Sequence, residues 1–308
     1  MREGVRRPSF AVLGPTPGTV FVTGKGGVGK TTFATALAAA AARVHGQAVY
    51  VEFSDGQSGR RAGIRRESDV EHVVLDLRDA VLKAAEELFG SKRIARFALG
   101  NFAMKPLIKA APALRELGVL ELARQVVVNR PGVPVVFDMP ASGHCVGWLK
   151  TPGQVRKLAA HGPLHSLCAR LEDQLLSPSK ASMVVVTLPE RLVLSETLLL
   201  NRTLEDEVGL PVDRIIVNRV PPAPSEQALT DAARLAALPG PEGAAAAQLV
   251  ERLAADLEAR EDALAIVREA ASGAESWSET RPPVFVPLSA SDPDVPTLAT
   301  QLMDRRAA

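Results

Sequence analysis

A glycine-rich stretch near the start of the chain has the residue types of a phosphate-binding loop. Residues 24–32 read Gly-Lys-Gly-Gly-Val-Gly-Lys-Thr-Thr, which fits the pattern G-x-x-x-x-G-K-[ST]. Glycines let the backbone wrap closely around an anion, and the N–H groups at a helix start attract it. We expect Lys30 to reach the β- and γ-phosphates of a nucleotide and the Thr31 hydroxyl to hold Mg²⁺. The residues expected to bind the nucleotide here are Gly24, Lys25, Gly26, Gly27, Val28, Gly29, Lys30, Thr31 and Thr32.

Such a loop needs a strand before it and a helix after it. An extended apolar run at residues 19–23 precedes it, and an alanine-rich helix is predicted from about residue 30 to 44. The alternative is a glycine-rich turn before an ordinary helix, and this context argues against it. Further strands are predicted at residues 48–53, 133–137, 182–187, 214–220 and 284–288. The pattern predicts an α/β fold of the P-loop NTPase type, with a mostly parallel twisted sheet flanked by helices.

Two aspartates stand at the ends of predicted strands, where open α/β sheets place their ligand chemistry. Asp55 follows the strand at 48–53. It is placed to orient a water for attack on the γ-phosphate, or to hold the water shell of the metal. An aspartate that begins an ordinary Asp-Gly turn fits this position equally well. Asp138 closes the buried strand at 133–137 and is the candidate Walker B residue, holding Mg²⁺ through its waters.

Two further residues are candidates for contacts with the nucleotide. Residues 139–145 contain the small residues of a loop that changes course when the γ-phosphate leaves, and the backbone of Gly143 is placed to report on that phosphate. Asn218 lies late in the strand at 214–220, and its amide has both the donor and the acceptor that adenine requires. An asparagine that merely ends a strand explains Asn218 equally well.

Composition limits the classes of protein that the chain can belong to. The chain has 308 residues, of which 46% are hydrophobic, and it can bury a large core. A net charge of +1 gives no argument for nucleic acid or for an anionic membrane as a partner. Two cysteines without a CxxC motif predict a reduced, cytoplasmic protein. No apolar run approaches the roughly 20 residues of a membrane span, so no stable membrane insertion is expected.

The predicted organisation is a flexible tail at residues 1–18 and a single domain at 19–308. Residues 71–128 are expected to be mostly helical, and their apolar stripes are more typical of a core than of a binding groove. Some sixty residues exceed what one crossover helix requires, which suggests an inserted helical subdomain where an apolar protein client could bind. Residues 221–242 are expected to form a mobile surface loop, and a long helix is predicted at about 244–271.

These motifs resemble the ArsA/GET family of SIMIBI P-loop ATPases. The resemblance runs from about residue 19 to residue 288 and is carried by residues 24–32, Ser54-Asp55, Phe137-Asp138 through Gly143-His144, Leu188-Pro189-Glu190 and Val217-Asn218-Arg219. Its most specific pieces are the two-lysine, deviant Walker A motif K-G-G-x-G-K-[ST] and the D-x-x-x-x-G-H switch after the third strand.

The resemblance implies a Mg²⁺-dependent ATPase that dimerises around its nucleotide. In such a protein Lys25 reaches the nucleotide of the partner subunit, which is a second copy or a paralogue. Asp55 is then the hydrolytic aspartate of switch I. By this resemblance the catalytic residues are Asp55, Lys25 and Lys30, the metal residues are Thr31 and Asp138, and the nucleotide also contacts Gly143 and Asn218.

The sequence also departs from the family pattern. Switch I normally reads S-T-D-P-A-H, whereas here Ser54-Asp55-Gly56-Gln57 retains the aspartate in altered surroundings. Arsenite binding in the pump uses three thiolates, and two scattered cysteines argue against that role. The client groove of the targeting factor is rich in methionine, and Met104 is the only methionine in region 71–128.

The sequence therefore predicts a cytoplasmic Mg-ATPase, a nucleotide-gated dimer that couples hydrolysis to binding or release of a protein client. One alternative is a positioning ATPase of the ParA/MinD type, which shares the two-lysine loop and binds DNA or membrane. Another is a low-turnover nucleotide-binding scaffold subunit of a heterodimer, suggested by the unusual switch I.

Overall fold

The structure is a computed structural model of the chain. It describes residue 13 and residues 18–53, 63–64, 67–76, 80–91, 93–94, 112–220, 225–273, 283–288 and 294–304. Asp55, most of the expected tail and residues 95–111 of the expected insert lie outside these residues. The division into a tail and one domain with an insert therefore stays a prediction.

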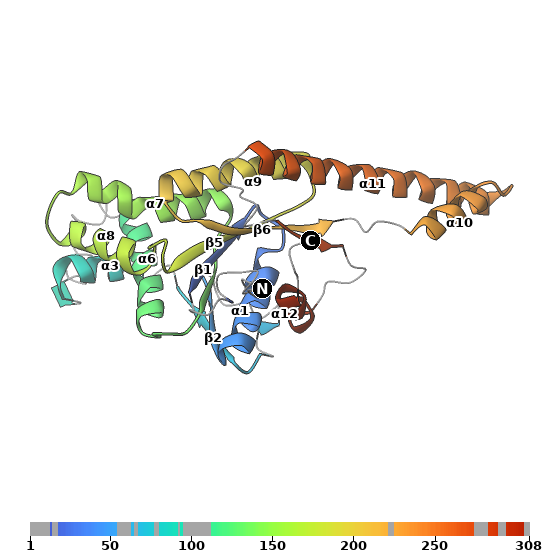
Figure 1. Ribbon diagram of the computed structural model, residues 1–308. Helices are drawn as coiled ribbons and strands as arrows, with labels where there is room; N and C mark the ends of the chain where they lie inside the picture. The colour runs from blue at the N-terminus through green and yellow to red at the C-terminus, as the bar shows by residue number, and fades with distance from the viewer. Residues whose placement is uncertain are drawn as a thin grey trace, which may run out of the picture.

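One parallel sheet of seven strands forms the centre of the described molecule, in the order β3-β2-β4-β1-β5-β6-β7 (Figure 1). The strands are β1 Thr19–Gly24, β2 Ala48–Glu52, β3 Val70–Val74, β4 Val135–Asp138, β5 Ala181–Thr187, β6 Val212–Val220 and β7 Val284–Pro287. The inner strands β1 and β5 are buried along their whole length and rich in valine, as expected for parallel strands covered by helices on both faces. The predicted α/β class is confirmed.

The edge strand β3 corrects the prediction that residues from about 71 onward are helical. Residues 70–74 read Val-Glu-His-Val-Val and pair in parallel with β2. Three β-branched valines in five residues favour an extended backbone, and the partly exposed pattern suits an edge position. Helices follow at α3 Ala80–Phe89 and α6 Pro112–Val128.

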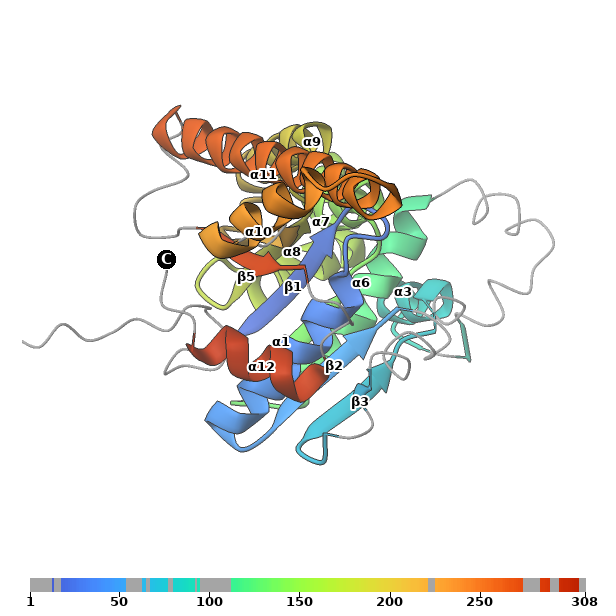
Figure 2. The same cartoon turned by 90° about the vertical axis from the view of Figure 1, so that its right-hand side faces the viewer.

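Helices cover both faces of the sheet. They are α1 Lys30–His45, α7 Ser142–Leu158, α8 Pro163–Gln174, α9 Arg191–Thr203 with the π-helical turn η3 Leu204–Val208, α10 Glu226–Ala236, α11 Pro241–Gly273 and α12 Val295–Asp304. On one face α1 and α12 lie side by side, as Figure 2 shows, and Leu298 and Leu302 of α12 are buried there. Among the described helices, none combines the length and the apolarity of a membrane span.

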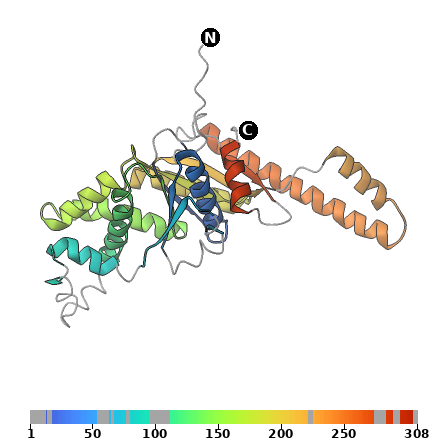
Figure 3. The same ribbon diagram turned by 90° about the horizontal axis from the view of Figure 1, so that it is seen from below.

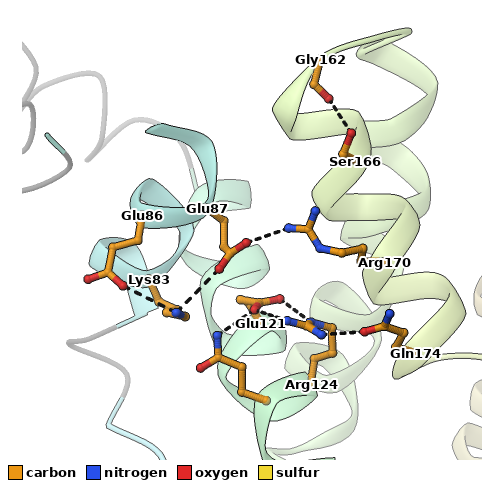
Figure 4. A network of polar contacts seen from close by, with 10 residues as sticks. Lys83, Glu86, Glu87, Glu121, Arg124, Gly162, Ser166, Arg170 and Gln174 are labelled. Atoms are coloured by element: carbon orange, nitrogen blue, oxygen red, sulfur yellow. Dashed lines mark hydrogen bonds and ion pairs between the residues drawn. The ribbon is translucent and has the colours of Figure 1, made fainter. Parts of the chain in front are cut away.

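A polar network joins the helices α3, α6 and α8 on the other face (Figure 4). Glu121 of α6 is fully buried, and Arg124 donates two hydrogen bonds of 2.7 Å to its carboxylate. Arg124 also donates to Gln174 of α8, while Arg170 of α8 donates to Glu87 of α3 at 2.7 Å. A buried carboxylate is tolerated only with such partners. Arg124 and Arg170 then link α8 to α6 and to α3.

Helices α10 and α11 form a long hairpin that extends away from the sheet (Figure 3). The surface loop predicted at 221–242 is therefore wrong for residues 226–236, which form α10. Alanine favours helix, and the Ser225 hydroxyl accepts a hydrogen bond from the Ala228 N–H and caps the first turn. The long helix predicted at 244–271 is confirmed within α11.

Candidate functional site

The glycine loop joins β1 to α1 at the carboxyl end of the sheet, as the sequence predicts. A Cβ added at Gly24 would lie 2.1 Å from the carbonyl oxygen of Val186 on β5, so only glycine fits there. Gly29 has a φ of 101° and precedes the first residue of α1. No side chain caps α1, so its first N–H groups remain available to an anion.

Lys30 extends from the first residue of α1 back over the loop. Its Nζ donates a hydrogen bond of 2.9 Å to the carbonyl oxygen of Lys25. Burial lowers the pKa of Lys30, and the nearby carboxylate of Asp138 opposes that shift. A phosphate would stabilise this half-buried ammonium more than the neutral carbonyl does, because the charge of an anion offsets the cost of desolvating the ammonium.

Thr31 and Asp138 meet as the Walker motifs predict, although 107 positions separate them in the chain. The Thr31 hydroxyl donates to Oδ2 of Asp138 at 2.7 Å. Burial raises the pKa of Asp138, while hydrogen bonds from Thr31 and Tyr50 and the charge of Lys30 act in the opposite direction. A hydroxyl and a carboxylate beside a phosphate loop are the hard oxygen donors that Mg²⁺ prefers. The residues present therefore fit a magnesium ion.

Lys25 is held by a residue that sequence analysis did not single out. Its Nζ lies 2.9 Å from Oε2 of Glu196, which is on the outer face of α9, and both side chains are about half exposed. A glutamate on an amphipathic helix carries no signal of its own, because most such residues are simply solvated. Only the folded chain shows that Glu196 stands next to the loop.

Asn218 contacts the phosphate loop directly. Its Nδ2 donates a hydrogen bond of 2.9 Å to the carbonyl oxygen of Val28, and its Oδ1 accepts one of 2.9 Å from the Arg219 N–H. A Cβ added at Gly29 would lie 2.7 Å from that Nδ2. The amide therefore braces the loop against the end of β6, and a contact with adenine stays a prediction.

We expect the Asn218→Ala variant to weaken ATP and GTP binding by a similar factor, about fivefold, because the hydrogen bond to Val28 holds the loop that both nucleotides would use. Isothermal titration with each nucleotide measures this. The exposed Asn129 provides the matched control, Asn129→Ala. Selective loss of ATP affinity, with GTP unaffected, would instead support recognition of adenine.

Gly143 lies in a helix rather than in the loop predicted at 139–145. Helix α7 begins at Ser142, so only the first residues after β4 form a loop. Gly143 is exposed in the first turn of α7, and a Cβ there would meet nothing within 4 Å. Cys145, one turn into the helix, is buried, and burial raises the pKa of its thiol to about 12. A role of Gly143 in sensing the phosphate stays a prediction.

A group of polar residues that the sequence motifs did not reveal lies beside Asp138. Tyr50 and Glu52 of β2 are buried, and the Tyr50 hydroxyl lies 3.1 Å from Oδ2 of Asp138 and 3.3 Å from Oε2 of Glu52. His72 of β3 places its Nε2 3.5 Å from the same Glu52 oxygen. The signal in the sequence was a tyrosine and a glutamate inside an otherwise apolar strand, where burial requires polar partners.

A glycine loop between a central parallel strand and a helix, with Lys30, Thr31 and Asp138 at its centre, defines a P-loop nucleotide-binding domain. The chain belongs to the CobQ/CobB/MinD/ParA nucleotide-binding domain family, whose sequence model matches residues 19–261.

Curated relatives come from mycobacteria. ATPase BagA of Mycobacterium tuberculosis (strain H37Rv) and Putative ATPase Mb3704 of Mycobacterium bovis are each 31% identical to this chain over 226 residues. The match covers 66% of this chain and 65% of each relative.

Proposed function

We propose that the chain is a Mg²⁺-dependent ATPase of the ArsA/GET type. The observation that carries this proposal is the 2.7 Å hydrogen bond from Thr31 to Asp138 beside the half-buried Lys30. Two lysines in the glycine loop and relatives named as ATPases support it.

Each residue of the site has a separate task in this proposal. The loop N–H groups and Lys30 bind the β- and γ-phosphates, and Lys30 offsets the negative charge that develops there during hydrolysis. Thr31 and Asp138 would hold Mg²⁺, which when bound supplies further positive charge next to the phosphates. Asp55, from the sequence motif alone, would orient the attacking water. Asn218 keeps the loop in place from β6.

We further propose that nucleotide gates a dimer, formed by two copies or with a paralogue, in the cytoplasm. Lys25 of one subunit would contact the nucleotide of the other, because a second loop lysine is not needed to bind phosphate within one subunit. The helical region around α3 and α6 would hold an apolar protein client. ATP would favour the dimer state that makes the contacts across the subunits, and hydrolysis would release it.

In the single subunit, Glu196 restrains the lysine that the dimer would need. We expect Glu196→Gln to free Lys25 and tighten ATP-dependent dimerisation up to about fivefold, because an exposed ion pair contributes about 0–1 kcal/mol. Sedimentation of both proteins with ATP at several concentrations gives the dimer dissociation constants. Glu207→Gln, which removes the partner of Lys150, is the matched control. Unchanged or weaker dimerisation in Glu196→Gln would refute the restraint.

The direct test of the proposed function is phosphate release from purified protein with Mg-ATP. Asp55→Asn and Lys25→Ala are assayed in parallel, with molecular mass from light scattering. Loss of activity in both variants, together with an ATP-dependent dimer of the parent, is the expected result. Activity that neither substitution changes would contradict the mechanism.

A positioning ATPase of the ParA/MinD type is the second candidate function, and the match to the CobQ/CobB/MinD/ParA family favours it. Such a protein pellets with DNA or with anionic liposomes when ATP is present. If this chain is of the ArsA/GET type, as we propose, it should not pellet with either of them. A third outcome is tight ATP binding without phosphate release, where co-expression of a paralogue restores the release. That outcome would indicate a low-turnover scaffold subunit of a heterodimer.

A further inference from the structure

A single tyrosine hydroxyl lies between the buried carboxylate of Glu52 and the partly buried carboxylate of Asp138 at the candidate site. Tyr50 is the only tyrosine of the chain and is completely buried. Its hydroxyl is 3.1 Å from Asp138 and 3.3 Å from Glu52, both measured to one carboxylate oxygen. Neither Tyr50 nor Glu52 belongs to the glycine loop or to the predicted switches.

Strand register explains why these groups meet. Residues 50 and 52 point to the same face of β2, because side chains alternate along a strand. Glu52 is the direct neighbour of Asp138 across the β2–β4 pair, and Tyr50 is the neighbour of His72 across the β2–β3 pair. The row therefore leads from the edge strand to the phosphate loop, where Thr31 meets Asp138.

Both donors to Asp138 bond to the same oxygen. Thr31 donates to Oδ2 at 2.7 Å and Tyr50 reaches that Oδ2 at 3.1 Å. Among the described residues, no hydrogen bond reaches the other oxygen, Oδ1. Two donors on one oxygen fix the rotation of the carboxylate, so Oδ1 has a defined direction.

The phenol has one proton for two acceptors. The hydroxyl lies between Oδ2 of Asp138 and Oε2 of Glu52, and Nε2 of His72 is 3.5 Å from the same Glu52 oxygen. The His72 ring also lies 5.3 Å from the Tyr50 ring, centroid to centroid. Glu52 and His72 thus complete the surroundings of the Tyr50 hydroxyl on the side away from Asp138.

We propose that Tyr50 is a positioning residue that holds Asp138 with Oδ1 presented to the water shell of Mg²⁺. The proposal rests on the proposed function, because it assigns Mg²⁺ to this site. Tyr50 acts only through Asp138 and touches neither metal nor nucleotide. Its removal should weaken Mg²⁺ binding while leaving the phosphate loop intact.

The test compares Tyr50→Phe with the parent by titrating Mg²⁺ at a saturating, non-hydrolysed ATP analogue. We expect the Mg²⁺ concentration for half-maximal binding to rise about tenfold, as expected when a carboxylate loses one of two hydrogen bonds. Affinity for the analogue in EDTA should stay within a factor of two. Thr151→Val is the matched control, because it also removes a mostly buried hydroxyl bonded to a carboxylate, that of Glu116, outside the site.

A second readout needs no variant of the tyrosine. With 3-fluorotyrosine incorporated, the one tyrosine gives one fluorine resonance, which we expect to shift when Mg²⁺ joins the bound analogue. Asp138→Asn should abolish that shift.

The role of Tyr50 is refuted, and the proposed function is not, by either of two results. One is an unchanged Mg²⁺ midpoint in Tyr50→Phe, and the other is a fluorine resonance that does not shift with Mg²⁺ although the parent binds the ion. If Tyr50→Phe does not fold, the shift of the fluorine resonance with Mg²⁺ in the folded parent tests the role of Tyr50. A parent whose nucleotide binding is independent of Mg²⁺ overturns the proposed function together with this role.

Discussion

We expect Lys30→Ala to lower ATP turnover by the proposed ATPase about 10²–10³-fold, the usual loss when one preorganised donor to developing charge is removed. Lys30 is half buried at the start of α1, and within the described part of the chain its Nζ bonds to the carbonyl oxygen of Lys25 and to no carboxylate. Its charge is therefore available to phosphate. The alanine variant leaves the helix intact, because alanine is the best helix former.

Phosphate release and analogue binding measure the effect, and a thermal melt checks the fold. Lys157→Ala, an exposed lysine in the last turn of α7, is the control and should keep full activity. Because burial lowers the pKa of Lys30, a part of the parent's activity should be lost when the pH rises through that pKa. Turnover by Lys30→Ala within tenfold of the parent would refute the assignment of the phosphate site.

The largest expected effect on stability lies away from the site, at Gly118 of α6. A Cβ added there would lie 1.7 Å from the carbonyl oxygen of Ala80 and 2.4 Å from its carbonyl carbon. These are backbone atoms of α3, so no side chain can move aside. We expect Gly118→Ala to lower the free energy of unfolding by about 3 kcal/mol, at the upper end of overpacking costs.

The cost is large because the added Cβ meets backbone atoms, so α3 and α6 must move apart and lose part of their packing. Urea unfolding followed by circular dichroism gives the change in stability. Gly147→Ala is the matched control, since a Cβ at this helical glycine meets nothing within 4 Å, and it should gain up to about 1 kcal/mol. Equal midpoints for the two variants would show that α3 and α6 are not in close contact.

Local sequence predicted most of the fold that surrounds the site. All six predicted strands and the helices at 30–44 and 244–271 occur near their expected positions, because apolar or alanine-rich runs carry strong local signals. The predictions failed where the signal was short or mixed. In β3 a glutamate and a histidine interrupt the valines, and α10 is bordered by prolines typical of loops.

By itself the sequence determined the phosphate loop, because Gly24 to Thr32 are contiguous and their chemistry depends on local backbone freedom. It also placed Asp138 at the end of a strand. Only the tertiary structure decided which distant groups meet. Parallel pairing aligned Glu52 with Asp138, placing Tyr50 in the same row, and helix packing brought Glu196 to Lys25. Strand order and register arise from the packing of the whole chain, and no short motif records them.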